Sequence, residues 1–275
     1  MNPTVTRSIS GVCFLAIMVC GLLFNKFVFG ALIIFIMVVM MAEFYALTMG
    51  EHYKGSRALA IVAGVILFAL VFSTYAFRLP AKFVGLAVIP LLVVMTLSLY
   101  AKDRSEFRMF ANLYTGMIYI AMPLALSNIL VFNKEGEFSG LLMLSFFCII
   151  WGSDVGAYCF GMLLGKNGRK LFPSISPKKS WAGFWGGLGT AVLTAIILNL
   201  TGLLVIPWYH SLILAVLMHV AGVYGDLFES QWKRVYDVKD SGKIIPGHGG
   251  FLDRFDSAIF AIPTGALYLM LVGLI

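Results

Sequence analysis

Long uninterrupted apolar runs constrain this chain more than any other feature of its sequence. Of its 275 residues, 60% are hydrophobic and only 12% are charged. A helix needs about 20 mostly apolar residues to cross the hydrocarbon core of a bilayer. Nine such runs are present, and they are continuous rather than alternating, which excludes a transmembrane β-barrel. They cover residues 8–25, 28–48, 57–77, 83–101, 110–132, 138–163, 181–203, 205–226 and 252–274. The sequence therefore predicts an all-α, polytopic integral membrane protein with about nine transmembrane helices.

The basic residues are distributed unevenly around these predicted spans. Sixteen of the 20 Lys and Arg fall at the N-terminus and in the even-numbered loops, with Arg254 counted among them, and four fall in the odd-numbered loops. The positive-inside rule then places the N-terminus and the two longest basic loops in the cytoplasm, and the C-terminus outside. The net charge of +7 follows from this bias. Because no nucleic-acid-binding module accompanies it, anionic membrane lipids and nucleotides are the expected partners, and nucleic acid is not.

Polarity divides the chain into two parts of one membrane-embedded domain, residues 1–275. Residues 1–133 have short loops and almost no ionisable residue within a predicted span, with Glu43 the exception. Glu43 is a functional candidate, and the alternative is that it reaches the interface, because it lies near the end of its run. Residues 134–275 hold the polar groups that we expect to line a cavity facing the cytoplasm. The first of these is Asp154, which is a functional candidate because an ionised carboxylate is costly in lipid. The alternative is that Asp154 only bonds a neighbouring helix.

A basic loop follows, GKNGRKLFPSISPKKSWAGFWGG (165–187). Pro173 and Pro177 exclude a continuous helix here. Two interpretations are open. The loop either anchors the protein at the cytoplasmic surface, or Lys178 and Lys179 clamp a phosphate group. It is not a Walker A loop, because the spacing of its glycines and the residue after the lysine are both wrong.

A third polar group begins inside the eighth run. Asp226, Ser230, Lys233 and Asp237 are spaced to share one face of a helix, if the helix continues that far. The following GHGG (247–250) cannot be ordinary helix, and its glycines free backbone N–H groups to converge on a phosphate.

We expect a new helix to start near Phe251, with Asp253 in its first turn and Asp256 one turn later. Carboxylates at a helix N-terminus can be purely structural, because the helix dipole favours them. That account explains one carboxylate but not the whole group of acids, cations and glycines.

Carboxylates, cations and a glycine turn together indicate a metal-bound polyphosphate, since Mg²⁺ is commonly held by one or two carboxylates and by substrate phosphates. Nucleotidyl or phosphoryl transfer needs mainly such positioning and charge stabilisation.

Residues 230–256, SQWKRVYDVKDSGKIIPGHGGFLDRFD, closely resemble the C-terminal signature of the phosphatidate cytidylyltransferases, also called CDP-diacylglycerol synthases. The segment SPKKSWAG (176–183) is similar to a second loop of that family. Two positions depart from the family pattern: Trp232 stands where an aliphatic residue is usual, and Ala182 where Glu is common. The matching signature positions are Ser230, Lys233, Arg234, Lys239, Asp240, Gly242, Pro246, His248, Gly249, Gly250, Asp253, Arg254 and Asp256.

The resemblance implies transfer of CMP from CTP to phosphatidate in the cytoplasmic membrane, with the active site facing the cytoplasm. It implies that Asp226 and Asp253 hold Mg²⁺, and it allows a second cation such as K⁺. The residues expected at the catalytic centre are Asp226, Asp253, Asp256, Lys233, Arg254 and His248. Those expected to bind substrate are Lys178, Lys179, Ser230, Arg234, Lys239, Asp240, Gly249, Gly250 and Asp154. The roles of His248 and Asp240, the acyl-chain preference and a homodimer are left open.

Four other functions are the alternatives. A CDP-alcohol phosphatidyltransferase is disfavoured, because its Asp-Gly-x-x-Ala-Arg motif is absent from the sequence. A related nucleotidyltransferase acting on an ether or isoprenoid phospholipid would carry the same signature. An ion or proton transporter would use Glu43, Asp154 and Asp226, but the polar residues gather in one part of the chain and give no sign of an inverted repeat. A non-catalytic lipid-binding scaffold leaves the acidic group unexplained.

Overall fold

The computed structural model describes residues 3–100, 104–166, 168–242, 244–245 and 249–275. Within this part of the chain nearly all regular structure is helical, and one two-stranded hairpin is present. The backbone contacts divide the chain into two compact units. Unit 1 comprises Met1–Phe138 and Asp240–Arg254, and unit 2 comprises Ser139–Lys239 and Phe255–Ile275. The single domain expected from the sequence stays a prediction.

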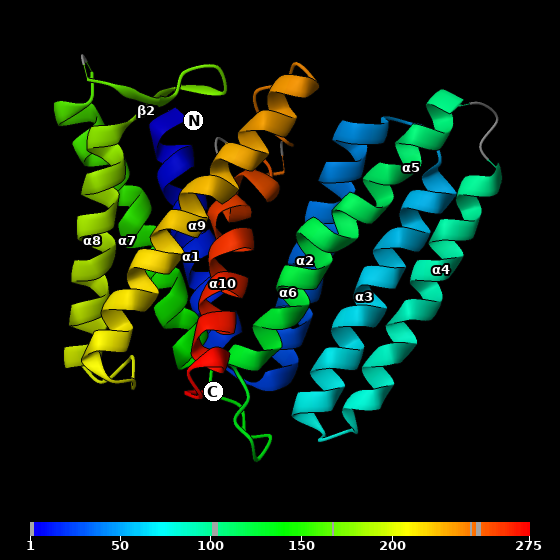
Figure 1. Cartoon of the computed structure of the whole chain (residues 1–275), viewed down its shortest axis with the longest axis horizontal. Coiled ribbons are helices and arrows are strands. Elements are labelled where there is room, and N and C mark those ends of the chain that lie inside the picture. The colour runs from blue at the N-terminus through cyan, green and yellow to red at the C-terminus, as the bar shows by residue number, and fades with distance from the viewer. Residues whose placement is uncertain (1–2, 101–103, 167, 243, 246–248) are drawn as a thin grey trace. The chain divides into compact units, whose positions relative to one another are not determined.

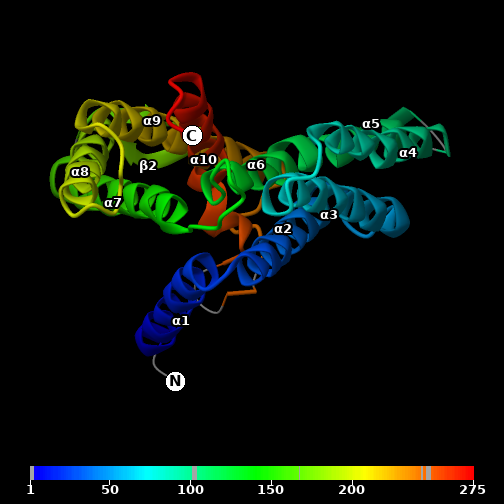
Figure 2. The same cartoon turned by 90° about the horizontal axis from the view of Figure 1, so that it is seen from below.

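Unit 1 is built from the N-terminal helices. Its α2 begins sharply because the side chain of Asn25 accepts hydrogen bonds from the backbone N–H groups of Phe27 (2.9 Å) and Val28 (3.0 Å). In Figures 1 and 2, α3 runs beside α2 and α4. The elements are α1 (Pro3–Leu23), α2 (Lys26–Met49), α3 (Lys54–Ala76), η1 (Ala81–Ala87), α4 (Val88–Leu97), η2 (Ser98–Tyr100), α5 (Arg104–Gly116), the π-helical η3 (Met117–Ala121), α6 (Met122–Leu126) and η4 (Ser127–Leu130).

Unit 2 contains the hairpin and the polar helices. Figures 1 and 2 show α7, α8 and α9 packed side by side within it. Its elements are α7 (Leu141–Leu164), β1 (Lys170–Phe172), β2 (Ser176–Ser180), α8 (Trp181–Leu200), α9 (Trp208–Val235) and most of α10 (Leu252–Leu271). A new helix was expected near Phe251 with Asp253 in its first turn, and α10 confirms this.

Glycines let α7 and α8 approach each other closely. A Cβ atom at Gly183 would lie 2.8 Å from the carbonyl oxygen of Ala157, and one at Gly187 would lie 2.9 Å from that of Ser153. These contacts are to backbone atoms of the facing helix, so a larger residue could not be accommodated by a side-chain rotation alone. The four-residue spacing of the two glycines is the small-residue pattern typical of closely packed membrane helices.

Seven helical segments of the described chain are long and apolar enough to cross a membrane: Lys26–Met49, Lys54–Ala76, Ala81–Tyr100, Met109–Leu130, Leu141–Leu164, Trp181–Leu200 and Trp208–Val235. They coincide with seven of the nine predicted runs. The other two runs also form helices, α1 and α10, but α1 offers only the shorter apolar stretch Ile9–Leu23 and α10 is not among the seven. The chain is thus a largely helical membrane protein, and the number nine stays a prediction.

One expectation about the eighth run is wrong. Asp226, Ser230 and Lys233 lie on α9, but the helix ends at Val235. Asp237 falls after that end, with a φ of 52° in the left-handed region. It therefore does not share the helical face of the other three residues.

Replacing Gly187 by Ala tests the close approach of α7 and α8. The added methyl group has no room, so we expect Gly187→Ala to lower the free energy of unfolding by about 1–3 kcal/mol. Gly189, two residues further along α8, is the matched control, because a Cβ atom there meets nothing within 4 Å. Thermal unfolding of the purified variants in detergent measures both effects. Equal stabilities of Gly187→Ala and Gly189→Ala would contradict the packing described here.

Candidate functional site

The basic loop of unit 2 is a short β-hairpin. Strands β1 and β2 are antiparallel, with Lys170 opposite Ser180 and Phe172 opposite Ser176. Ser180 ends the hairpin and starts α8, because its hydroxyl accepts a hydrogen bond from the backbone N–H of Gly183 (3.2 Å).

Two polar contacts attach this hairpin to α9. Nζ of Lys179 lies 2.5 Å from Oδ2 of Asp226, and both side chains are less than one third exposed. On the next turns of α9, Nε of Arg234 donates a hydrogen bond to the carbonyl oxygen of Ile175 (3.2 Å). The neighbouring Lys178 is exposed. The structure thus brings together Lys179 and Asp226, two predicted site residues that are 47 positions apart in the sequence.

Four carboxylates gather around this attachment in unit 2. Asp226 and Glu229 lie on α9, Asp154 lies on α7 and Asp256 on α10, and the charges of the other three repel the carboxylate of Asp256. Ser230 donates a hydrogen bond to Oδ1 of Asp226 (3.3 Å). We call these four residues the acidic cluster. Three of them were predicted site residues.

Glu229 is the member that the sequence reasoning did not select. It is buried, and it forms an ion pair with Lys233 one turn along α9. The i, i+4 spacing of Glu229 and Lys233 was the available signal. An acidic residue buried among apolar helices is costly unless a cation accompanies it, so this pair explains how α9 tolerates Glu229.

Oxygen ligands and cations are therefore both present in unit 2, a donor set suited to a hard cation such as Mg²⁺. The described residues contain no group of three or more His, Cys, Asp or Glu side chains arranged to hold a metal ion. A site of one or two carboxylates completed by substrate phosphates would not need such a group. Magnesium, and a second cation such as K⁺, stay predictions.

In the signature segment, residues 240–254 of unit 1, described residues donate hydrogen bonds to the carboxylate of Asp253. Oδ2 of Asp253 accepts hydrogen bonds from the backbone N–H groups of Ser241 (3.0 Å) and Gly250 (2.8 Å) and from the hydroxyl of Ser241 (3.0 Å). Gly249 turns the chain with a φ of +83°, which glycine adopts without strain. The N–H of Gly250, which the sequence suggested for phosphate binding, is thus directed at Asp253.

Glu43 of α2 contacts the same segment. Its side chain is only 5% exposed, and Oε2 accepts a hydrogen bond from the backbone N–H of Leu252 (2.9 Å). The hydroxyl of Ser241 lies 3.4 Å from the same oxygen. This contact joins residues about 200 positions apart, and no local sequence pattern predicted it.

The remaining predicted site residues have simpler positions. Lys239, Asp240 and Arg254 are exposed, and His248 lies outside the described residues. Asp226 belongs to unit 2 and Asp253 to unit 1, so a metal ion shared by the two stays a prediction.

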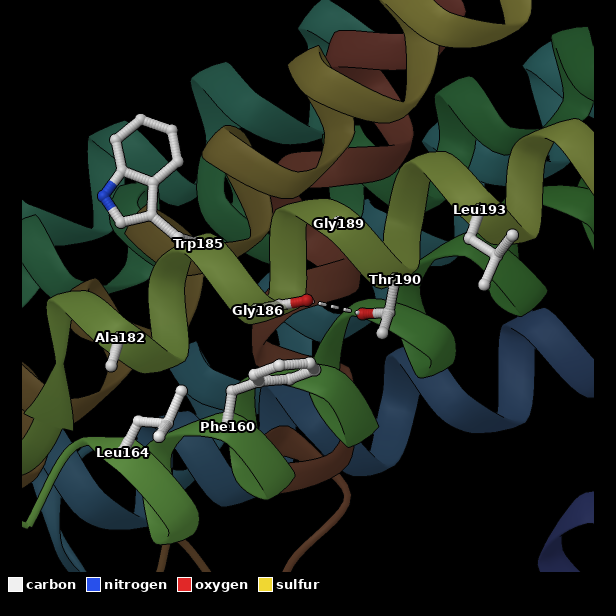
Figure 3. A pocket seen from close by; sticks show the side chains of 8 residues that line it. All are labelled: Phe160, Leu164, Ala182, Trp185, Gly186, Gly189, Thr190 and Leu193. Atoms are coloured by element: carbon white, nitrogen blue, oxygen red, sulfur yellow. Dashed lines mark hydrogen bonds between the residues drawn. The ribbon is translucent and has the colours of Figure 1, made fainter.

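An apolar groove of about 450 Å³ lies between α7 and α8 in unit 2. Figure 3 shows Phe160 and Leu164 on one side and residues of α8 on the other, with Thr190 bonded to the carbonyl of Gly186. Ala182, at the position where the related family commonly has Glu, is one of the lining residues. This groove is not the polar cavity that the sequence predicts, and the polar cavity stays a prediction.

Comparison with known proteins identifies the family of the chain. The model of the Cytidylyltransferase family matches residues 5–272, so the chain belongs to this enzyme family. The chain is 40% identical over 187 residues to "Phosphatidate cytidylyltransferase" of Bacillus subtilis, covering 68% of this chain and 67% of that protein. It is 37% identical over 172 residues to the protein of the same name from Staphylococcus epidermidis (62% and 63%), and 40% identical over 165 residues to that of Rickettsia typhi (55% and 67%). The alignments thus span about two thirds of these relatives, and the family expected from the signature is confirmed.

Replacing Lys179 tests whether its contact with Asp226 holds the hairpin on α9. We expect Lys179→Met to speed amide hydrogen exchange in the hairpin strands, 170–172 and 176–180, by up to about fivefold, the effect of losing a partly exposed ion pair worth about 1 kcal/mol. The exposed Lys178 gives the matched control, Lys178→Met. If both variants exchange at the wild-type rate, the ion pair does not stabilise the hairpin.

Proposed function

We propose that the chain transfers CMP from CTP to phosphatidate, giving CDP-diacylglycerol and pyrophosphate. The observation that carries this proposal is the pairing of Lys179 with Asp226. It sets a cationic hairpin against the acidic cluster in a largely helical membrane protein of the cytidylyltransferase family. A triphosphate needs cations, its metal ion needs carboxylate oxygens, and a lipid substrate needs a site within the membrane. The names of the relatives supply phosphatidate as the lipid.

In the proposed reaction, a phosphate oxygen of phosphatidate attacks the α-phosphorus of CTP in line. A new P–O bond forms on the lipid phosphate, and the bond from the α-phosphorus to the bridging oxygen breaks, so that pyrophosphate leaves with that electron pair. Because phosphatidate is already an anion, no strong general base is required. Lys178, Lys179, Lys233, Arg234 and Arg254 would balance the negative charge of the phosphates.

Carboxylates of Asp226 and Asp253 would hold Mg²⁺ when substrate is bound, and the ion would neutralise phosphate charge. The hydrogen bonds to Asp253 fit this role, because donation from Ser241 and Gly250 to Oδ2 fixes the orientation of its carboxylate. In our proposal the active site faces the cytoplasm, where CTP is found. This orientation rests on the uneven distribution of Lys and Arg among the loops.

The test is transfer of tritium from cytosine-labelled CTP into the organic phase, with purified protein, phosphatidate and Mg²⁺ in detergent. We expect transfer by the wild type and a loss of about a hundredfold or more in kcat for Asp253→Asn, because the neutral amide removes a ligand charge. Asp237→Asn is the control, since Asp237 lies outside α9 and Asn tolerates its left-handed φ. Folded wild-type protein that gives no transfer over a range of Mg²⁺ concentrations would refute the proposed function. Near-normal turnover by Asp253→Asn would remove this residue from the catalytic centre.

A further inference from the structure

The carboxylate of Glu43 occupies space that two glycines of the signature segment leave open. A Cβ atom at Gly242 would lie 2.3 Å from Oε1 of Glu43 and 2.7 Å from its carboxyl carbon. A Cβ atom at Gly250 would lie 2.5 Å from Oε2. Neither glycine has a φ in the left-handed region, in contrast to Gly249. Their lack of a side chain is therefore explained by the space that Glu43 takes and not by an unusual backbone conformation.

Hydrogen bonds connect Glu43 to Asp253 through this same segment. Ser241 places its hydroxyl 3.4 Å from Oε2 of Glu43 and 3.0 Å from Oδ2 of Asp253. The N–H of Gly250 donates to Asp253, and the N–H of Leu252 donates to Glu43. Both carboxylates thus accept backbone hydrogen bonds from described residues of this segment, and Glu43 fixes Leu252 to α2.

A buried carboxylate in a membrane-spanning helix is costly and calls for a specific role. Glu43 lies in the candidate span Lys26–Met49, and its Oε1 atom is buried without a hydrogen-bond partner. A transporter would need this acid to exchange ions or protons with water. Here its other oxygen is bonded to the backbone of the chain itself, which favours a role in holding the chain.

We propose that Glu43 is a positioning residue for the signature segment, and that its carboxylate orients Asp253 by holding Ser241 and Leu252. The consequence for catalysis rests on the proposed function. The positioning itself does not, and it can be measured without turnover.

Hydrogen exchange of the signature segment tests the positioning directly. We expect Glu43→Ala to raise exchange of the Leu252 amide about tenfold, because one charge-assisted hydrogen bond is lost. Glu43→Gln keeps an acceptor oxygen and is expected to restore most of the protection. Glu51→Ala is the control and leaves the segment unchanged, because Glu51 lies in the exposed turn between α2 and α3, where it pairs with Lys54. Wild-type exchange in Glu43→Ala would overturn the proposal.

A double-mutant cycle tests the fit between Glu43 and Gly242. Gly242→Ala alone is expected to raise exchange in the segment, since its methyl group collides with the carboxylate. In the Glu43→Ala background the same change is expected to have little further effect, because the space is then free. Gly55→Ala, where a Cβ atom meets nothing within 4 Å, is the control and shows no coupling. Equal effects of Gly242→Ala in both backgrounds would contradict the fit.

Kinetics separate positioning from mere folding. We expect Glu43→Ala to lower kcat per folded molecule at least about tenfold with the KM for CTP little changed, and Glu43→Gln to recover much of the loss. A normal kcat together with raised exchange would overturn the link to catalysis. If the wild type itself shows no transfer, the proposed function fails, and the exchange measurements alone then decide whether Glu43 positions the segment.

Discussion

The cost of placing a carboxylate in a membrane-spanning helix governs the polar architecture of this chain. In hydrocarbon, an ionised acid persists only where a cation, a set of hydrogen-bond donors or water accompanies it. Three acids show how the chain meets this requirement: Asp226 pairs with Lys179, Glu229 pairs with Lys233, and Glu43 accepts the N–H of Leu252. Two of these contacts, those of Asp226 and Glu43, also fix a segment of the candidate site. The hairpin is held on α9, and the signature segment is held on α2, by the same contacts that make the acids tolerable.

Much of the helical architecture could be predicted from the sequence, because span length and hydrophobicity are local properties. The apolar runs coincide with helices, and Asp253 lies in the first turn of α10 as its position after the glycines suggested. Asp237 was expected on the polar face of α9 only if the helix continued that far, and the helix ends at Val235. Helix ends depend on capping contacts that hydrophobicity does not encode.

The candidate site was predicted less completely, for a different physical reason. The polar residues of the eighth run and of the basic loop identified Asp226 and Lys179 separately, but only the folded chain shows them in contact. Glu43 was noticed as a lone acid within a span, yet its partner Leu252 is 209 residues away. Contacts of that separation leave no periodic pattern in one sequence. The glycines of the signature do carry the information, because Gly242 and Gly250 leave the volume that the Glu43 carboxylate fills.

In our account, the paired acids and cations of this chain support nucleotidyl transfer to a lipid phosphate. Parallel reactions with CTP labelled at the α- or the γ-phosphorus test it most directly, because attack at the α-phosphorus separates the two labels. The account predicts that the α-label enters the organic phase while the γ-label remains in aqueous pyrophosphate, in equal amounts. Lipid that carries the γ-label, or γ-label released as pyrophosphate without α-label in lipid, would contradict it.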